Sequence, residues 1–399
     1  MARIITKATH EQIKNHNKSI VLRTIYESNY ISRADISRKT GLTRAAVSEI
    51  VGELIEEGLV EERGVVSGGV GKPPTLLGLR EDARVFLCVD FSDEVYHGAL
   101  VNLRGQIRHW VDWPLASSQG EEALRHGLDL IEALRSAAPA PLAGIGVGTP
   151  GVVDIERGVI QEAVNRGWRD LPLAELLIRR YGLPVFIAND SHMTALAEYR
   201  FGIGVGSRSL IAIKISQGIG SGVILEGRLL GGDSHAAGEI GHMVIREDGA
   251  PCTCGNQGCL ETVASLRALV QRAQEEAARH PDSRLAALQA ERGSIGLREL
   301  QTALQEGDPL TRALVVEAGR ALGVAIAAMV SVLDVERVVL CGEGAALGPV
   351  LLEAVRAEVR WRILPRIAER VEIHLSQLGK EAVIFGASAM MIAQFFQLD

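Results

Sequence analysis

Gly238-Glu239-Ile240-Gly241-His242, followed by Cys252-Thr253-Cys254-Gly255-Asn256-Gln257-Gly258-Cys259-Leu260-Glu261, is the segment from which the fold of this chain can be predicted. Zinc favours thiolate and imidazole ligands in a tetrahedron, and the segment supplies four of them: His242, Cys252, Cys254 and Cys259. Because four protein ligands leave no position for water, we expect a structural rather than a catalytic Zn²⁺ site. The alternative is a group of reduced thiols with an unrelated histidine nearby.

The length and composition of the chain indicate a large globular protein. At 399 residues it is long enough for two or three domains, and 47% hydrophobic with 23% charged residues is typical of a globular chain. The longest apolar run, Leu322 to Leu333, is shorter than the roughly 18 residues of a membrane span. The first residues lack the apolar core of a signal peptide, so we expect a cytoplasmic protein without a membrane segment.

The charges are distributed unevenly between the two ends. Residues 1–80 hold 12 Lys and Arg against 9 Asp and Glu, a net charge of +3, whereas residues 81–399 hold 30 against 40. A mildly basic N-terminal part on an acidic body is what a DNA-binding head on a small-molecule-binding body would show.

The N-terminal part carries the signals of two short helices separated by a turn. Ser32-Arg33-Ala34-Asp35 resembles a capping box that opens a helix ending at Thr40-Gly41, and Thr43 can cap a second helix to about Glu57. Apolar residues of the second helix recur at three- and four-residue spacing: Val47, Ile50, Val51, Leu54 and Ile55. We also expect a preceding core helix over Ile20–Tyr26, with Asn15–Lys18 as its polar lead-in.

Helix, glycine turn and helix is the geometry that places the second helix in the major groove of DNA. Its first-turn residues Thr43, Arg44, Ala45 and Ser48 are the expected base-edge contacts. The glycine-rich segment between Arg63 and Leu79 predicts a β-hairpin wing with Lys72 at its tip. The alternative is a helical hairpin that contacts another protein.

After Val85, apolar strands alternate with helices, which is typical of an α/β fold. Val185–Ala188 is a buried strand that delivers Asn189 and Asp190 to its carboxyl end, where ligands bind in open α/β sheets. Asp190 is therefore a candidate general base or acceptor for a sugar hydroxyl, and equally a candidate helix N-cap.

Two glycine-rich segments, Ser216–Gly222 and Cys341–Gly344, each follow an apolar strand. Such turns allow backbone amides to approach a phosphate, and two of them at one cleft would suit a nucleotide. For the first segment, a β-hairpin with ordinary turn chemistry is the better interpretation of the spacing.

From about Asn15 to the C-terminus the chain resembles the ROK family (repressors, open reading frames and kinases), most specifically in the segment quoted first. The resemblance implies a winged helix-turn-helix on an actin-like, ribonuclease-H-like body of two lobes, as in sugar kinases. Residues 1–80 would form the head and 196–380 the second lobe, while 81–195 would form the first, completed by a C-terminal helix over 381–399. It also implies a sugar pocket lined by Asn189, Asp190, Glu239, His242 and Glu261.

The chain departs from the family's kinases at the motifs that bind a nucleotide. Where the kinases have Asp-x-Gly-Gly-Thr, it reads Asp90-Phe91-Ser92-Asp93-Glu94. Two added carboxylates near the phosphates repel them by about 1 kcal/mol each even in water. Gln217 replaces the usual Thr of the second loop, and Glu343 interrupts the glycines of the adenosine motif. We therefore expect no enzymatic activity, with Asp190 occupying a vestigial base position.

Three functions follow from these features. The first is a sugar-responsive transcriptional regulator, a repressor released from operator DNA by a small sugar and acting as a homodimer or homotetramer. The second is an ATP-dependent sugar kinase that retains a DNA-binding head. The third is a DNA-binding protein that responds to no sugar. The sequence favours the first and does not identify the sugar or the operator.

Overall fold

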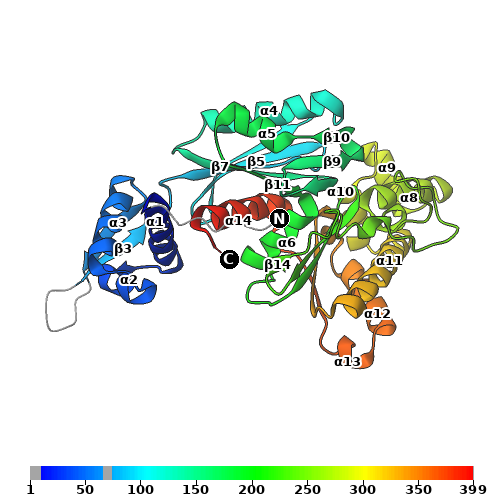
Figure 1. Ribbon diagram of the computed structural model, residues 1–399. Coiled ribbons are helices and arrows are strands. Elements are labelled where there is room, and N and C mark those ends of the chain that lie inside the picture. The colour runs from blue at the N-terminus through cyan, green and yellow to red at the C-terminus, as the bar shows by residue number, and fades with distance from the viewer. Residues whose placement is uncertain (1–9, 66–73, 399) are drawn as a thin grey trace.

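The computed structural model describes residues 10–65 and 74–398 and consists of a small head and a two-lobed body (Figure 1). The head contains helices α1 (His10–Glu27), α2 (Arg33–Thr40) and α3 (Arg44–Glu56). Beside them lies a sheet of order β1-β3-β2, formed by Ile31–Ser32, Thr75–Leu79 and Val60–Val65. The predicted wing tip, with Gly71-Lys72-Pro73, lies outside the described residues.

The helix-turn-helix signals act as the sequence predicts. The Ser32 side chain accepts a hydrogen bond from the Asp35 amide, and Gly41 ends α2 in the left-handed conformation at φ 73°. Thr43 caps α3, whose buried residues are Val47, Ile50, Val51 and Leu54. Ile55, predicted to share this stripe, is only partly buried.

The first helix is longer than predicted. The residues expected to form a polar lead-in, Asn15–Lys18, belong to α1. Lys14 forms an ion pair with Glu53 of α3, and Lys18 with Glu57 just after it. These contacts and the buried Val21, Leu22 and Ile25 fix α1 against α3.

Lobe 1 contains a five-stranded sheet of order β11-β7-β4-β5-β6. Its strands, in chain order, are Val85–Asp90, Val95–Asn102, Ile107–Pro114, Leu142–Thr149 and Val185–Asn189. Strands β4, β7 and β11 are parallel, whereas β5 and β6 pair antiparallel. Helices α4 (Gly120–Ser136) and α5 (Leu173–Tyr181) cover the outer face (Figure 1). Between the lobes a smaller sheet joins β8 (Val152–Asp154), β9 (Val159–Ala163) and β10 (Trp168–Leu171).

Lobe 2 repeats this topology with the order β14-β13-β12-β15-β16. Its strands are Leu210–Ile215, Ile219–Leu225, Arg228–Leu229, Arg337–Cys341 and Glu372–Leu375. In both lobes the first three strands form an antiparallel meander and the last two add in parallel beside the first. This duplication confirms the two-lobed, ribonuclease-H-like body.

The outer helices of lobe 2 are α8 (Leu266–Arg279), α9 (Arg284–Arg292), α10 (Leu297–Gln305), α11 (Pro309–Leu333), α12 (Pro349–Arg362) and α13 (Pro365–Ala368). Within the described residues, α11 is the one helix long and apolar enough to cross a membrane. It begins at Pro309, well before the apolar run Leu322–Leu333 noted in the sequence. Most of its apolar stretch is buried, and it packs on α12 in the lobe core.

Helices α6 (Asp190–Phe201) and α14 (Ala382–Phe396) cross between the two sheets (Figure 1). Helix α14 packs on β4 and β7 of lobe 1, and α6 on β12 and β13 of lobe 2. Glycines permit the close contacts: a Cβ on Gly386 of α14 would lie 1.9 Å from the Met193 carbonyl oxygen of α6. Helix α6, which begins at Asp190, is therefore fixed to both lobes.

Candidate functional site

A cavity of about 480 Å³ lies between the lobes, and the five predicted sugar-site residues all line it. Asn189 and Asp190 lie where β11 ends and α6 begins, and Glu239 and His242 lie in the loop after β14. Glu261 is the first residue of the short helix α7 (Glu261–Ala264). Segments up to 72 residues apart in the chain thus converge on one cleft.

The first two of these residues have different roles. Asn189 is the N-cap of α6: its Oδ1 accepts hydrogen bonds from the Ser191 and His192 amides, and its Nδ2 donates to the Gly151 carbonyl. Asp190 is the first residue of the helix and faces the cavity. The capping role considered for Asp190 therefore belongs to Asn189, which leaves the Asp190 carboxylate available to a ligand.

Lys214 of β12 is a site residue that the sequence analysis missed. Its Nζ lies 2.5 Å from Asp190 Oδ2 and 3.0 Å from Ser92 Oγ, with 8% of the side chain exposed. Burial lowers the pKa of Lys214, but the carboxylates of Asp190, Asp93 and Asp90 outweigh burial and raise it. The available signal was a single lysine in the otherwise apolar strand Leu210–Ile215.

The metal-ligand candidates are close together. The ligand atoms of His242, Cys252, Cys254 and Cys259 all lie within 4.8 Å of one another. Cys254 Sγ is 3.7 Å from Cys259 Sγ, and Cys252 Sγ is 3.7 Å from His242 Nδ1. A tetrahedron with Zn–S bonds of about 2.3 Å places neighbouring sulfurs about 3.8 Å apart. The cluster therefore has the donor set and the spacing to hold a metal ion.

His242 connects this cluster to the cleft. Its Nδ1 faces Cys252, while its Nε2 lies 3.9 Å from Glu239 Oε2. Glu261 approaches the same ring from the other side, with Oε1 3.7 Å from Nδ1. Burial raises the pKa of Glu239, and the nearby Asp190 and Glu261 add to this effect. Order in the metal loop would therefore position two carboxylates that line the cleft.

The segment Asp90–Glu94 is held by contacts with the rest of lobe 1 and within itself. Buried Arg166 donates hydrogen bonds to the carbonyls of Phe91 and Asp93, and the Phe91 ring is buried against Gly127 and Tyr96. Asp90 accepts from the Ser92 amide, which a phosphate-binding turn would direct at the ligand. The Ser92 amide is thus occupied within the segment, and Arg166 fixes the Phe91 and Asp93 carbonyls.

The glycine-rich segments have structural roles in the sheet of lobe 2. Ser216–Gly222 is not one turn: Ile219–Leu225 forms β13, which pairs antiparallel with β12, so the β-hairpin interpretation is confirmed. In the second segment, a Cβ on Gly342 would lie 2.5 Å from the Ile215 carbonyl oxygen. Partial desolvation and nearby Asp93 raise the pKa of Glu343.

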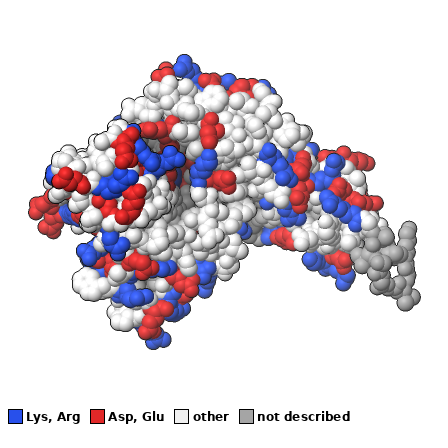
Figure 2. Space-filling view, turned by 180° about the vertical axis from the view of Figure 1, so that it is seen from behind, with Lys and Arg blue, Asp and Glu red and all other residues white. Residues whose placement is uncertain are grey.

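On the head, the predicted DNA-contact residues Thr43, Arg44, Ala45 and Ser48 are all exposed at the start of α3. Lys72 lies outside the described residues. Acidic and basic side chains are interspersed on the side of the molecule shown in Figure 2, without a single large basic face there. Base contacts by the start of α3 would provide sequence recognition.

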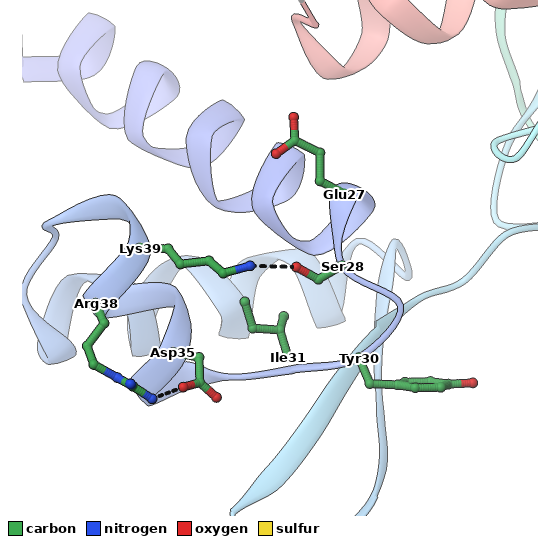
Figure 3. Close-up of a pocket in the computed structure, with 7 residues that line it drawn as sticks. All are labelled: Glu27, Ser28, Tyr30, Ile31, Asp35, Arg38 and Lys39. Atoms are coloured by element: carbon green, nitrogen blue, oxygen red, sulfur yellow. Dashed lines mark hydrogen bonds and ion pairs between the residues drawn. The ribbon is translucent and has the colours of Figure 1, made fainter. Parts of the chain in front are cut away.

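A separate hollow lies in the head, between the end of α1 and α2 (Figure 3). Its two cations have internal partners: Arg38 pairs with Asp35, and Lys39 Nζ lies 3.4 Å from Ser28 Oγ. These side chains stabilise the junction of α1 and α2, and we assign no ligand to this hollow.

Comparison with known families identifies both parts of the chain. A model described as the ROK family matches residues 86–394, which is most of the chain. The chain belongs to the ROK family. A second model, described as the MarR family, matches residues 15–69 of the head.

Relatives of two kinds match this ROK protein. The xylose repressor of Caldicellulosiruptor bescii is 31% identical, with 96% of this chain and 97% of the relative covered. A crystal structure of a ROK family transcriptional regulator, homologous to the Escherichia coli Mlc protein, has a TM-score of 0.82 at 28% identity, covering 97% of this chain and 98% of the other. A glucokinase of Halalkalibacterium halodurans is 36% identical, covering 63% of this chain and 77% of the relative. The repressor and the regulator thus match head and body together.

Proposed function

We propose that this protein is a sugar-responsive DNA-binding transcriptional regulator, a repressor that leaves its operator when a small sugar binds between the lobes. The observation that carries the proposal is the presence in one chain of a winged helix-turn-helix head and a cleft into which all five sugar-site residues converge. The head would be residues 1–80 and lobe 2 residues 196–380, while lobe 1 would comprise residues 81–195 and the helix within 381–399.

We further propose that the metal is a structural Zn²⁺ ion held by His242, Cys252, Cys254 and Cys259. Zinc requires deprotonated thiols, whereas burial raises the pKa of Cys252 to about 12 in the absence of a metal. Metal binding would therefore release protons and order the loop at the same time. The partners we propose are operator DNA and a small sugar, with the protein acting in the cytoplasm as a homodimer or homotetramer on paired half-sites.

The packing of the body offers a route from sugar to DNA. Asp190 lies at the start of α6, which crosses α14 at Gly386. At the other end of α14, Phe396 stacks on Tyr26 of the head with ring centroids 4.1 Å apart. Arg104 of lobe 1 donates to the Tyr26 carbonyl and lies over the Tyr26 ring. A shift of α6 relative to α14 would therefore reach the head through packed side chains.

The Arg44→Ala variant is expected to bind operator DNA at least tenfold more weakly, because Arg44 is exposed at the start of α3. Its sugar affinity should be unchanged, since Arg44 belongs to the head and does not line the cleft. Fluorescence anisotropy on operator DNA and calorimetry with sugar measure the two effects. Arg179→Ala is the control, since Arg179 is an equally exposed arginine on α5 of lobe 1. Equal operator affinity of the two variants would contradict the assignment of α3 as the recognition helix.

An ATP-dependent sugar kinase is the second candidate, because Asp190 faces the cleft and ROK glucokinases are relatives. We expect no sugar-stimulated ATP consumption, since the Asp90–Glu94 segment is held by Arg166 and adds carboxylates near the phosphates. A coupled ATP assay with hexoses and pentoses tests this, with a ROK glucokinase as positive control. Turnover that the Asp190→Asn substitution abolishes would show that the protein is a kinase.

A further inference from the structure

Lys214 and Ser216, at the carboxyl end of β12, connect lobe 2 to lobe 1 across the cleft. Lys214 contacts Asp190 and Ser92 of lobe 1, and Ser216 Oγ lies 3.1 Å from Asp93 Oδ1. The segment Asp90–Glu94, which would hold phosphates in a kinase, is here joined directly to lobe 2. The lobes are thus bridged at the bottom of the cleft by side chains of the protein itself.

Lys214 is also the only Lys or Arg among the described residues that line this cavity. Five carboxylates line it with Lys214: Asp93, Glu162, Asp190, Glu239 and Glu261. A buried ammonium among carboxylates is held firmly by them. Among the described residues that line the cleft, Lys214 is therefore the one cationic hydrogen-bond donor for an oxygen of a ligand.

The hydrogen-bonding capacity of the Lys214–Asp190 pair is incomplete. An ammonium has three N–H donors, and two of those of Lys214 are directed at Asp190 and Ser92. The Asp190 carboxylate accepts from Lys214 and from the Ser191 amide, which leaves further lone pairs free. One donor and at least one acceptor thus remain side by side. A sugar hydroxyl, which both donates and accepts, matches this combination.

We propose that Lys214 is a specificity-determining residue of the effector site, which donates a hydrogen bond to one hydroxyl of the bound sugar while Asp190 accepts from the same or the adjacent hydroxyl. This inference rests on the proposed sugar-binding function. Because Lys214 belongs to lobe 2 and Asp190 and Ser92 to lobe 1, the hydroxyl is read by both lobes at once. A sugar that lacks this hydroxyl leaves a buried ammonium without one partner and is rejected.

The test is calorimetric titration of D-xylose, D-glucose and the monodeoxy forms of each into the full-length protein. The variants are Lys214→Met, Lys214→Arg and the control Lys380→Met. Lys380 is an exposed lysine that pairs with Asp112 on lobe 1, away from the cleft. Lys214→Arg keeps the positive charge near Asp90, Asp93 and Asp190, but its planar group places the donors differently. Circular dichroism establishes that each variant is folded.

The wild type and Lys380→Met are expected to prefer one parent sugar at least tenfold over one of its deoxy forms. Lys214→Met and Lys214→Arg should bind that parent sugar at least tenfold more weakly and lose the preference. If Lys214→Met does not fold, Lys214→Arg decides. Retained affinity, or weaker binding with the preference intact, would overturn the role of Lys214 while leaving the proposed function standing. Binding of no sugar by the wild type, with the panel extended to other pentoses, hexoses and amino sugars, would overturn both.

Discussion

The Cys254→Ser variant is expected to lose its metal ion and, with it, at least tenfold in sugar affinity. A serine hydroxyl stays protonated at neutral pH and is a poor ligand, so three donors would remain of the four. Cys254 is exposed, and its replacement therefore removes no core packing. The backbone hydrogen bonds of this loop, among them those from the Cys252 and Gly258 amides, join residues of the loop to one another. Metal loss should therefore disorder the loop and release Glu239 and Glu261 from their positions.

Zinc content by plasma mass spectrometry, sugar affinity by calorimetry and the unfolding temperature measure this prediction. The Asn256→Ser variant is the matched control, because Asn256 is exposed in the same loop and is not a ligand. It should retain one metal ion per chain and normal sugar binding. Chelator treatment of the wild type should reproduce the defects of Cys254→Ser, and added zinc should reverse them. A Cys254→Ser protein with one zinc ion and unchanged sugar affinity would refute the assigned ligand set.

The features predicted correctly from the sequence are those specified by neighbouring residues. Ser32 and Thr43 cap α2 and α3, and Gly41 ends α2, because capping involves residues at most three or four positions apart. The four proposed metal ligands come from one short segment, and they lie together in the structure. The parallel strand β11 carries Asn189 at its carboxyl end, and Asp190 follows directly, so neighbouring residues again specify their position.

The features that could not be predicted depend on contacts between distant segments. Nothing near Lys214 in the sequence indicates that Asp190 forms an ion pair with it or that Ser92 accepts a hydrogen bond from it. Strand β6 carries charged residues on a half-exposed edge, and the short strands β8–β10 are defined by pairing with one another. Helix α1 forms an ion pair with α3 and another with Glu57 just after it. Each of these elements is stabilised by a partner that only the folded chain brings near.

Binding of the effector sugar is expected to weaken operator binding tenfold to a hundredfold. This range requires only about 1.4 to 2.7 kcal/mol of difference in sugar affinity between the DNA-bound and the released conformation. A sugar held by Lys214 of lobe 2 and Asp190 of lobe 1 would fix the angle between the lobes. Helices α6 and α14 would transmit that angle to the Tyr26–Phe396 contact with the head. By linkage, operator DNA must weaken sugar binding by the same factor.

Fluorescence anisotropy of DNA from upstream of the protein's own gene, titrated with the purified protein at one fixed salt concentration, tests this account most directly. The titration is repeated with a panel of pentoses, hexoses and amino sugars. The Asp190→Asn variant is the control, since it should bind the DNA but respond poorly to sugar. The account predicts specific binding that one sugar weakens at least tenfold in the wild type. Operator affinity that no sugar changes, or binding no tighter than to unrelated DNA, would contradict it.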